Sequence, residues 1–229
     1  MDNGWSQKHL LRVILTSETY RQSSRISAEL RDHDPQNRLL ARGPRFRLSA
    51  EGVRDNALAI SGLLSLHSFG PPIRPPQPDG LWNKVGGDRY EYVVSAGSER
   101  YRRGLYVVLK RMSPYPSLIT FDATARLSCR VKRQRSNTPL QALTLLNDPV
   151  YVEAAQALAK RIDDENANKN LDATLTHAFR LAVSRSPSAG ELDVLRALQT
   201  AEAAANGTEA AWFAVASALL NLDETITKN

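Results

Sequence analysis

The residues best placed to do chemistry are cations interleaved with tyrosines in the middle of the chain. Residues 98–135 carry ten Arg and Lys against two acids, and the whole chain has a net charge of +6. Such a cluster attracts anionic partners, and tyrosine rings between the cations can stack on sugar rings. The segment therefore predicts a surface that binds an anionic polymer. The side chains assigned to this surface are Tyr101, Arg102, Arg103, Tyr106, Arg111, Arg130, Arg133 and Arg135.

The alternative is that these arginines lie inside the protein. Most of the chain's basic residues are Arg, whose planar fork suits internal carboxylates and carbonyl groups as well as ligands. In that case they hold the fold together and dock other domains, which makes the chain a structural or interaction module. Reversing the charge of Arg102 and Arg103 separates the two hypotheses. The expected internal partners are Glu18, Asp55, Glu91 and Asp122.

A second group of polar residues surrounds two expected helix starts. Asn137 and Gln141 lie around the first start, and Asn147 and Asp148 precede the second. Amides and carboxylates of this kind can bind a sugar or another hydroxylated ligand. The same residues are common helix caps and turn formers, and that interpretation is favoured because it explains their positions without a ligand.

The remaining reactive residues form no motif. Cys129 lies among arginines that could activate its thiolate, but a buried structural cysteine is favoured because no His is near in sequence. The four histidines show no spacing typical of a metal site, and no phosphate loop or nucleophile motif is present. No nucleic-acid module is visible, so nucleic acid is disfavoured as a partner. We therefore expect a non-catalytic domain.

The elements that must position these residues begin with two capped helices. Ser6 is expected to cap a helix with apolar residues at 10, 11, 14 and 15, and Ser49 a second helix up to about residue 64. Residues 70–80 then hold five prolines, which predicts an extended strap rather than a helix or a central strand. The strap either separates two subdomains or lies along the surface.

The middle and the last third of the chain differ in expected structure. Residues 90–94 and 105–109 are short β-prone runs, which predict a small hairpin, with a helix over 101–112 as the alternative. Thr138, Pro139 and Gln141 form a capping box that opens a helical bundle. We predict a mainly α fold with a small β-hairpin in the middle and a Pro-rich strap. The expected parts, within one compact domain, are 1–69, 70–136 and 137–229.

The chain resembles a known family over most of its length. The matching stretches include Tyr-Arg-Arg-Gly-Leu-Tyr at 101–106, Asn-Thr-Pro-Leu-Gln-Ala-Leu at 137–143 and Leu-Asn-Asp-Pro at 146–149. Through these it is similar to a planctomycete-specific C-terminal domain of unknown function, domain of unknown function 1553. Further matches lie at residues 15–24, 37–48, 51, 54–55, 78–82, 116–118, 120–122 and 219–224.

The resemblance implies a setting for the domain. Members of that family are typically exported proteins with a cytochrome-c-like region upstream, often encoded near sulfatase-like genes. It therefore implies a periplasmic or extracytoplasmic location, a missing N-terminal part of the domain, and sulfated polysaccharide as the favoured anionic polymer. It also leaves open docking onto upstream cytochrome-c-like domains, or a part in the substrate site of a carbohydrate-linked oxidoreductase.

The chain itself carries no sign of a cofactor, a membrane anchor or an export signal. It has no Cys-x-x-Cys-His sequence, so we expect no cofactor in this chain and haem only in upstream domains. No apolar run approaches the ~20 residues of a membrane helix, and no signal peptide is visible at the N-terminus. From the residues alone the compartment stays open.

Overall fold

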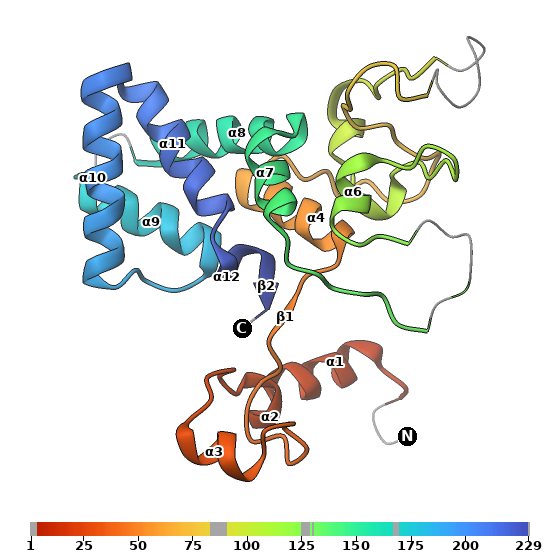
Figure 1. The fold of residues 1–229 in the computed structure, drawn as a ribbon, viewed down its shortest axis with the longest axis vertical. Coiled ribbons are helices and arrows are strands. Elements are labelled where there is room, and N and C mark those ends of the chain that lie inside the picture. Colours follow the sequence, from red (N-terminus) through yellow and green to blue (C-terminus); the bar gives the residue numbers. More distant parts are fainter. Residues whose placement is uncertain (1–3, 83–90, 125–128, 130, 167–169, 229) are drawn as a thin grey trace. The chain divides into compact units, whose positions relative to one another are not determined.

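The computed structural model describes residues 4–82, 91–124, 129, 131–166 and 170–228. It is mainly helical, as predicted, with one small antiparallel sheet (Figure 1). Contacts divide the chain into two compact units, residues 1–47 with 227–229, and residues 48–226. The predicted boundaries after residues 69 and 136 both fall inside the second unit. No helix in the described part of the chain is long and apolar enough to cross a bilayer.

The first unit contains three short helices and the sheet. The helices are α1 (Gln7–Thr16), α2 (Glu18–Arg21) and α3 (Ala28–His33). Ser6 caps α1 as predicted, because its side chain accepts a hydrogen bond from the backbone N–H of His9 at 3.3 Å. Strand β1 (Phe46–Arg47) pairs antiparallel with β2 (Thr227–Lys228), so the sheet joins two segments that lie far apart in the sequence.

The second unit is built on a helical core. Its long helices are α4 (Ala50–Ser61), α8 (Pro149–Asn166), α9 (Leu171–Val183), α10 (Ala189–Asn206) and α11 (Thr208–Leu220). Helix α8 packs against both α4 and α11, and α10 packs against α9 and α11. Leu58, Leu158, Leu175 and Leu219 come from four of these helices and are fully buried. Burial of these apolar side chains is the main driving force for this part of the fold.

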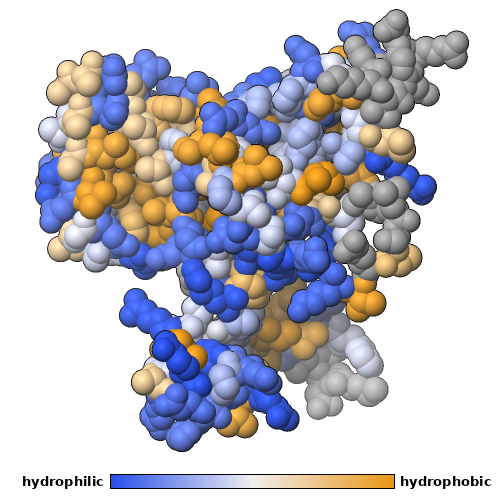
Figure 2. Space-filling view, in the orientation of Figure 1, coloured by the Kyte–Doolittle hydropathy of each residue, from blue (hydrophilic) through white to orange (hydrophobic). Residues whose placement is uncertain are grey.

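Shorter elements cover one end of that core. They are the 3-10 helices η2 (Gly97–Tyr101) and η3 (Gly104–Tyr106), and α6 (Pro116–Thr120), α7 (Pro139–Asn147) and α12 (Asp223–Ile226). The predicted capping box at Thr138 and Gln141 is present at the start of α7. Apolar side chains are exposed where α7 lies (Figure 2), and they include Leu140, Leu143 and Leu146.

The small β element is not where the sequence predicted it. Within 90–109, Tyr90 lies outside the described residues, 91–96 form no strand, and the rest contains η2 and η3. Val107 instead makes a single bridge to Ile73 in the Pro-rich strap. Prolines have no N–H to donate, and four of them flank Ile73 within three residues, so pairing cannot extend into a ladder.

Candidate functional site

Two fully buried arginines, one on α4 and one within the basic segment, hold that segment in place. The side chain of Arg54 on α4 is 1% exposed, and its guanidinium donates to the carbonyl groups of Arg102 at 2.6 Å and Arg100 at 2.7 Å. Burial lowers the pKa of Arg54 from its usual value, and the nearby Asp55 carboxylate opposes that effect. Arg54 therefore positions the backbone of the basic segment on α4.

Arg102 in turn holds the start of the Pro-rich strap. Its side chain is 0% exposed and donates to the carbonyl groups of His67 at 3.1 Å, Phe69, and Pro71 at 3.2 Å. Its guanidinium also lies 4.0 Å from the centre of the Tyr106 ring. Phe69 has a φ of 70°, which is unfavourable for a residue with a side chain. The hydrogen bond from Arg102 thus supports a strained turn.

Hydrogen bonds continue along the strap. Backbone bonds join Ile73 to Tyr106 and Val108, and the hydroxyl groups of Tyr92 and Tyr115 donate to the carbonyl groups of Pro75 and Pro76. Burial raises the pKa of Tyr92 to about 12. The strap therefore belongs to the second unit and is fixed there on both sides.

Three further residues predicted to bind a ligand have internal partners. The hydroxyl of Tyr101 donates to Glu153 at 2.6 Å, and that of Tyr106 accepts from the backbone N–H of Phe69 at 2.8 Å. Gln141 is 1% exposed and donates to the carbonyl of Thr120 at 2.9 Å. These contacts, with the capping box, agree with the structural interpretation of Gln141.

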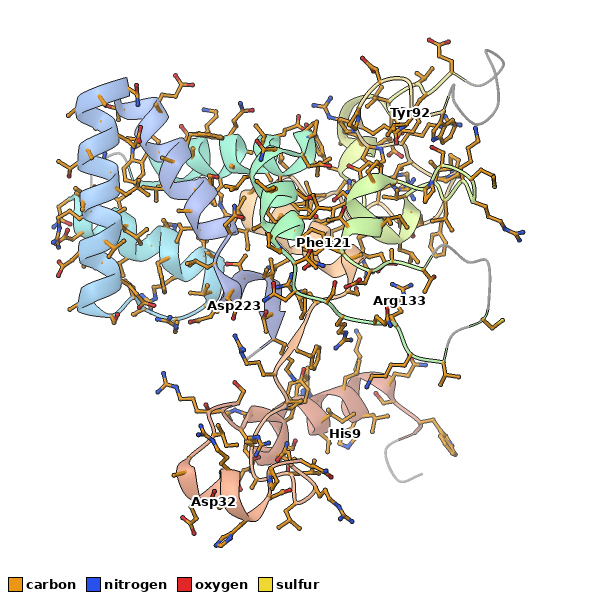
Figure 3. The ribbon with its side chains drawn as sticks, viewed as in Figure 1. His9, Asp32, Tyr92, Phe121, Arg133 and Asp223 are labelled. Atoms are coloured by element: carbon orange, nitrogen blue, oxygen red, sulfur yellow. The ribbon has the colours of Figure 1, made fainter. Side chains whose placement is uncertain are left out.

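Other cations of the basic segment reach the surface beside the N-terminal half of α4. The Arg103 side chain is 58% exposed, and its Nε lies 3.5 Å from a carboxylate oxygen of Asp55. The Arg133 side chain is 39% exposed and donates hydrogen bonds to the two carboxylate oxygens of Glu51 at 2.7 and 2.9 Å. Glu51 and Asp55 are one helical turn apart, so the two arginines meet the same face of α4. Figure 3 labels Arg133 at this place.

The two carboxylates differ in their electrostatics. Burial would raise the pKa of Glu51, but hydrogen bonds from Arg133 bring it below its usual value. Burial raises the pKa of Asp55, against the opposing effects of the Gly104 N–H and the charges of Arg54 and Arg103. Glu51 thus pairs with Arg133, and Asp55 lies between the buried Arg54 and the exposed Arg103.

We call this group the polycation surface and define it as Arg103, Lys132, Arg133 and Arg135. Lys132 and Arg135 flank Arg133 in the chain, and both are exposed. Arg103 and Arg133 therefore lie against the two carboxylates, and Lys132 and Arg135 are exposed neighbours of Arg133 in the chain. Asn137 follows this segment and is also exposed.

Three other sequence predictions have different outcomes. Arg111 is exposed, but no contact places it on the polycation surface. Arg130 lies outside the described residues. Cys129 is exposed, so the prediction of a buried structural cysteine is wrong. The prediction failed because it relied on the general tendency of cysteine to be buried, whereas Cys129 lies in a polar, Arg-rich segment that connects two elements.

Arg54 is the important residue that the site prediction missed. It lies outside the basic segment, but it precedes Ala57 and Leu58 by three and four residues and so shares their buried face. A cation on the apolar face of a helix was the available signal. Among the described residues no group of His, Cys, Asp and Glu is arranged to hold a metal ion.

Comparison with known proteins gives a family and no function. No curated protein and no solved structure matches the chain. One family model, described as PSD1, protein of unknown function (DUF1553), matches residues 1–199. Since this match covers most of the sequence, the chain belongs to the DUF1553 family.

Proposed function

We propose that this domain is a non-catalytic binding module that holds an anionic polymer at the polycation surface, with sulfated polysaccharide as the favoured ligand. The observation that carries the proposal is the exposure of Arg103 and Arg133 on one face of α4, together with the exposed Lys132 and Arg135 that flank Arg133 in the chain. An arginine fork engaged by one carboxylate has further N–H donors for a sulfate group.

The division of the arginines supports this proposal and refines the predicted site. Arg102 is fully buried and acts in the fold, as do the hydroxyl groups of Tyr101 and Tyr106. Arg103, Arg133 and Arg135 remain accessible, and Lys132 joins them. The proposed ligand therefore meets cations from two segments of the chain and does not depend on tyrosine stacking.

The test is binding of dextran sulfate, with unsulfated dextran as the reference ligand. The Arg103→Gln/Arg133→Gln double variant is expected to lose about tenfold or more in affinity, since two charge-assisted contacts are removed. Arg196→Gln is the matched control, because Arg196 is also 39% exposed and pairs with two carboxylates in another part of the same unit. Equal losses in the control, or equal binding of unsulfated dextran, would overturn the proposal.

A further inference from the structure

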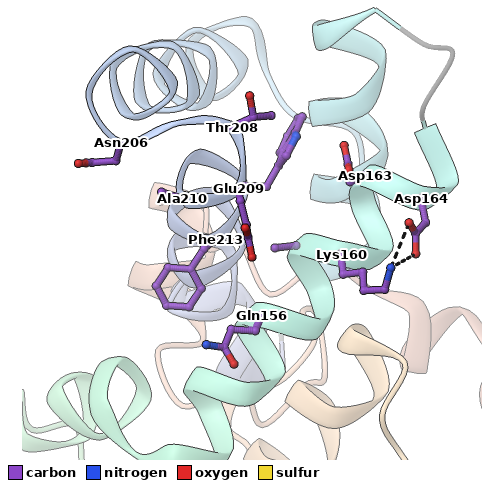
Figure 4. Close-up of a pocket in the computed structure, with 11 residues that line it drawn as sticks. Gln156, Lys160, Asp163, Asp164, Asn206, Thr208, Glu209, Ala210 and Phe213 are labelled. Atoms are coloured by element: carbon purple, nitrogen blue, oxygen red, sulfur yellow. Dashed lines mark hydrogen bonds and ion pairs between the residues drawn. The ribbon is translucent and has the colours of Figure 1, made fainter.

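A pocket in the second unit differs in chemistry from the polycation surface. It lies between α8, the C-terminal end of α10 and the first turns of α11 (Figure 4). Its volume is about 730 Å3, which is within the range that holds small organic molecules. Trp212 and Phe213 supply aromatic rings to its lining, and Asp163 and Glu209 supply carboxylates. None of its lining residues belongs to the polycation surface.

The indole of Trp212 has an unused hydrogen-bond donor. Its side chain belongs to the buried core, with only 8% of the residue exposed. Within the described part of the chain its N–H makes no hydrogen bond, and the nitrogen is not among the polar atoms that are closed off from solvent. Because Trp212 lines the pocket, a ligand there can replace water as the acceptor of this hydrogen bond.

Asp163 has an uncompensated negative charge. It lies in the last turn of α8 with Asp164 and Glu165, where the helix dipole disfavours acids. Lys160 pairs with Asp164 at 3.0 Å, and Arg161 pairs with Glu165 at 2.7 Å.

No ion pair or hydrogen bond joins Asp163 to any residue that the structure describes. Figure 4 shows the Lys160–Asp164 pair on one side of α8 and Asp163 on another. Asp163 is therefore the one acid of that turn without a cationic partner among the described residues.

Glu209 adds a second carboxylate from the facing helix. It lies in the first turn of α11, where the helix dipole stabilises an acid, and it has no partner among the described residues. With Lys160 already paired to Asp164, the free charges that line the pocket are both negative. These two carboxylates attract a cationic ligand and repel an anionic one.

We infer that this pocket binds a small organic cation that also carries hydroxyl groups. The cation lies between Asp163 and Glu209, and its adjoining carbon framework packs on Trp212 and Phe213, whose ring faces attract positive charge. A hydroxyl oxygen accepts the hydrogen bond that the Trp212 indole donates. The inference is independent of the polyanion proposal, because it concerns other residues and a ligand of opposite charge.

The experiment compares glucosamine with glucose below neutral pH, where the two sugars differ by one charged amine. Each is titrated into the millimolar range while the Trp212 indole N–H signal, assigned with Trp212→Phe, is followed by NMR. Glucosamine is expected to shift that signal in a saturable way, and glucose to bind about tenfold or more weakly. The Asp163→Asn variant should bind glucosamine about tenfold or more weakly than wild type, as expected when a contact to a charged group is lost.

Asp193→Asn is the matched control, because it neutralises an exposed acid of α10 outside the pocket lining. It should keep wild-type affinity, and thermal unfolding of each variant checks that the fold is intact. An unmoved Trp212 signal would overturn the inference. Equal affinity for glucose, or unchanged glucosamine affinity in Asp163→Asn, would overturn it too. Arg103→Gln/Arg133→Gln should bind glucosamine normally, so the two proposals can fail separately.

Discussion

At the scale of single residues, Arg54 and Arg102 form two successive links between α4 and the Pro-rich strap. Arg54 fixes the backbone at residues 100 and 102, and Arg102 then fixes the carbonyl groups at residues 67, 69 and 71. Removing a charged donor from carbonyl groups costs free energy, and removing a fully buried side chain also leaves a cavity. The two arginines therefore connect α4 to the Pro-rich strap.

Replacing Arg102 with Ala should strongly destabilise the protein. The change leaves three carbonyl groups without their donor and opens a cavity, so we expect the free energy of unfolding to fall by about 3 kcal/mol or more. Urea denaturation measures it. Arg111→Ala is the control, since Arg111 is exposed and should change stability by less than about 0.5 kcal/mol.

Arg102→Lys should restore only part of that loss. An ammonium group cannot reproduce the planar fork that reaches several carbonyl groups at once. If the urea midpoint of Arg102→Ala equals that of the wild-type protein, the structural role assigned to Arg102 is wrong.

The sequence could not separate buried from exposed arginines. Arg102 and Arg103 are neighbours of the same type, yet one is fully buried and the other is 58% exposed. Arg102 bonds the carbonyl groups of residues 67, 69 and 71 and Arg103 pairs with Asp55, all more than thirty positions away, and no local pattern contains these contacts. Gln141 was easier to interpret, because its capping role depends on Thr138 only three residues before it.

At the scale of elements, helix ends decide much of the electrostatics. Ser188 and Glu191 form a capping box at the start of α10, and Arg185 joins Glu191 to Glu224 in α12 at 2.7 Å each. Hydrogen bonds from Arg185 and from the Ser188 N–H lower the pKa of Glu191 to about 2. Arg185 thus connects the start of α10 to α12 through two carboxylates, Glu191 and Glu224.

Stability should depend on pH through Glu191. Its folded pKa lies below the ordinary value of 4.5, so its contribution is complete above pH 4.5 and is lost as the pH falls toward about 2. Because the group is solvent-exposed, we expect less than about 1 kcal/mol. Chemical denaturation across this range should show a flatter pH dependence in Glu191→Gln than in wild type. Parallel curves for the two proteins would contradict the assignment.

Asp163→Asn should make the protein slightly more stable. The substitution removes an unpaired negative charge from the last turn of α8, which we expect to add on the order of 0.5 kcal/mol to the free energy of unfolding. Asp164→Asn, which breaks the pair with Lys160, should show no such gain. Thermal unfolding of both variants measures the difference. A loss of stability in Asp163→Asn would mean that this carboxylate has a structural partner.

Helix starts were predictable and strand pairing was not. Ser6, Ser49 and Ser188 each accept a backbone N–H three residues ahead, so sequence alone places those starts. The strand prediction for residues 105–109 failed because Val107 pairs with Ile73, across a proline-rich segment that allows one bridge only. The pocket was missed because α8 and α11 bring its residues together from distant parts of the chain.

At the scale of the whole molecule, the chain forms two compact units, and its composition does not predict this division. Strand β1 near residue 46 pairs with β2 near the C-terminus, so the last residues belong to the first unit. The second unit contains both candidate sites, one rich in cations and one in carboxylates. The sequence predicted the cation-rich segment but not that residues 227–228 pair with residues 46–47, because no local pattern contains a pairing across that separation.

The measurement that tests the central claim most directly is the salt dependence of dextran sulfate binding to the wild-type protein. Binding through exposed cations must weaken with ionic strength, because salt screens charges over about 10 Å at 0.1 M and about 3 Å at 1 M. We predict that affinity falls by about tenfold or more across that range, with a smaller fall in Arg103→Gln/Arg133→Gln. Affinity for dextran sulfate that stays constant across the range would contradict the polycation surface as a polyanion-binding site.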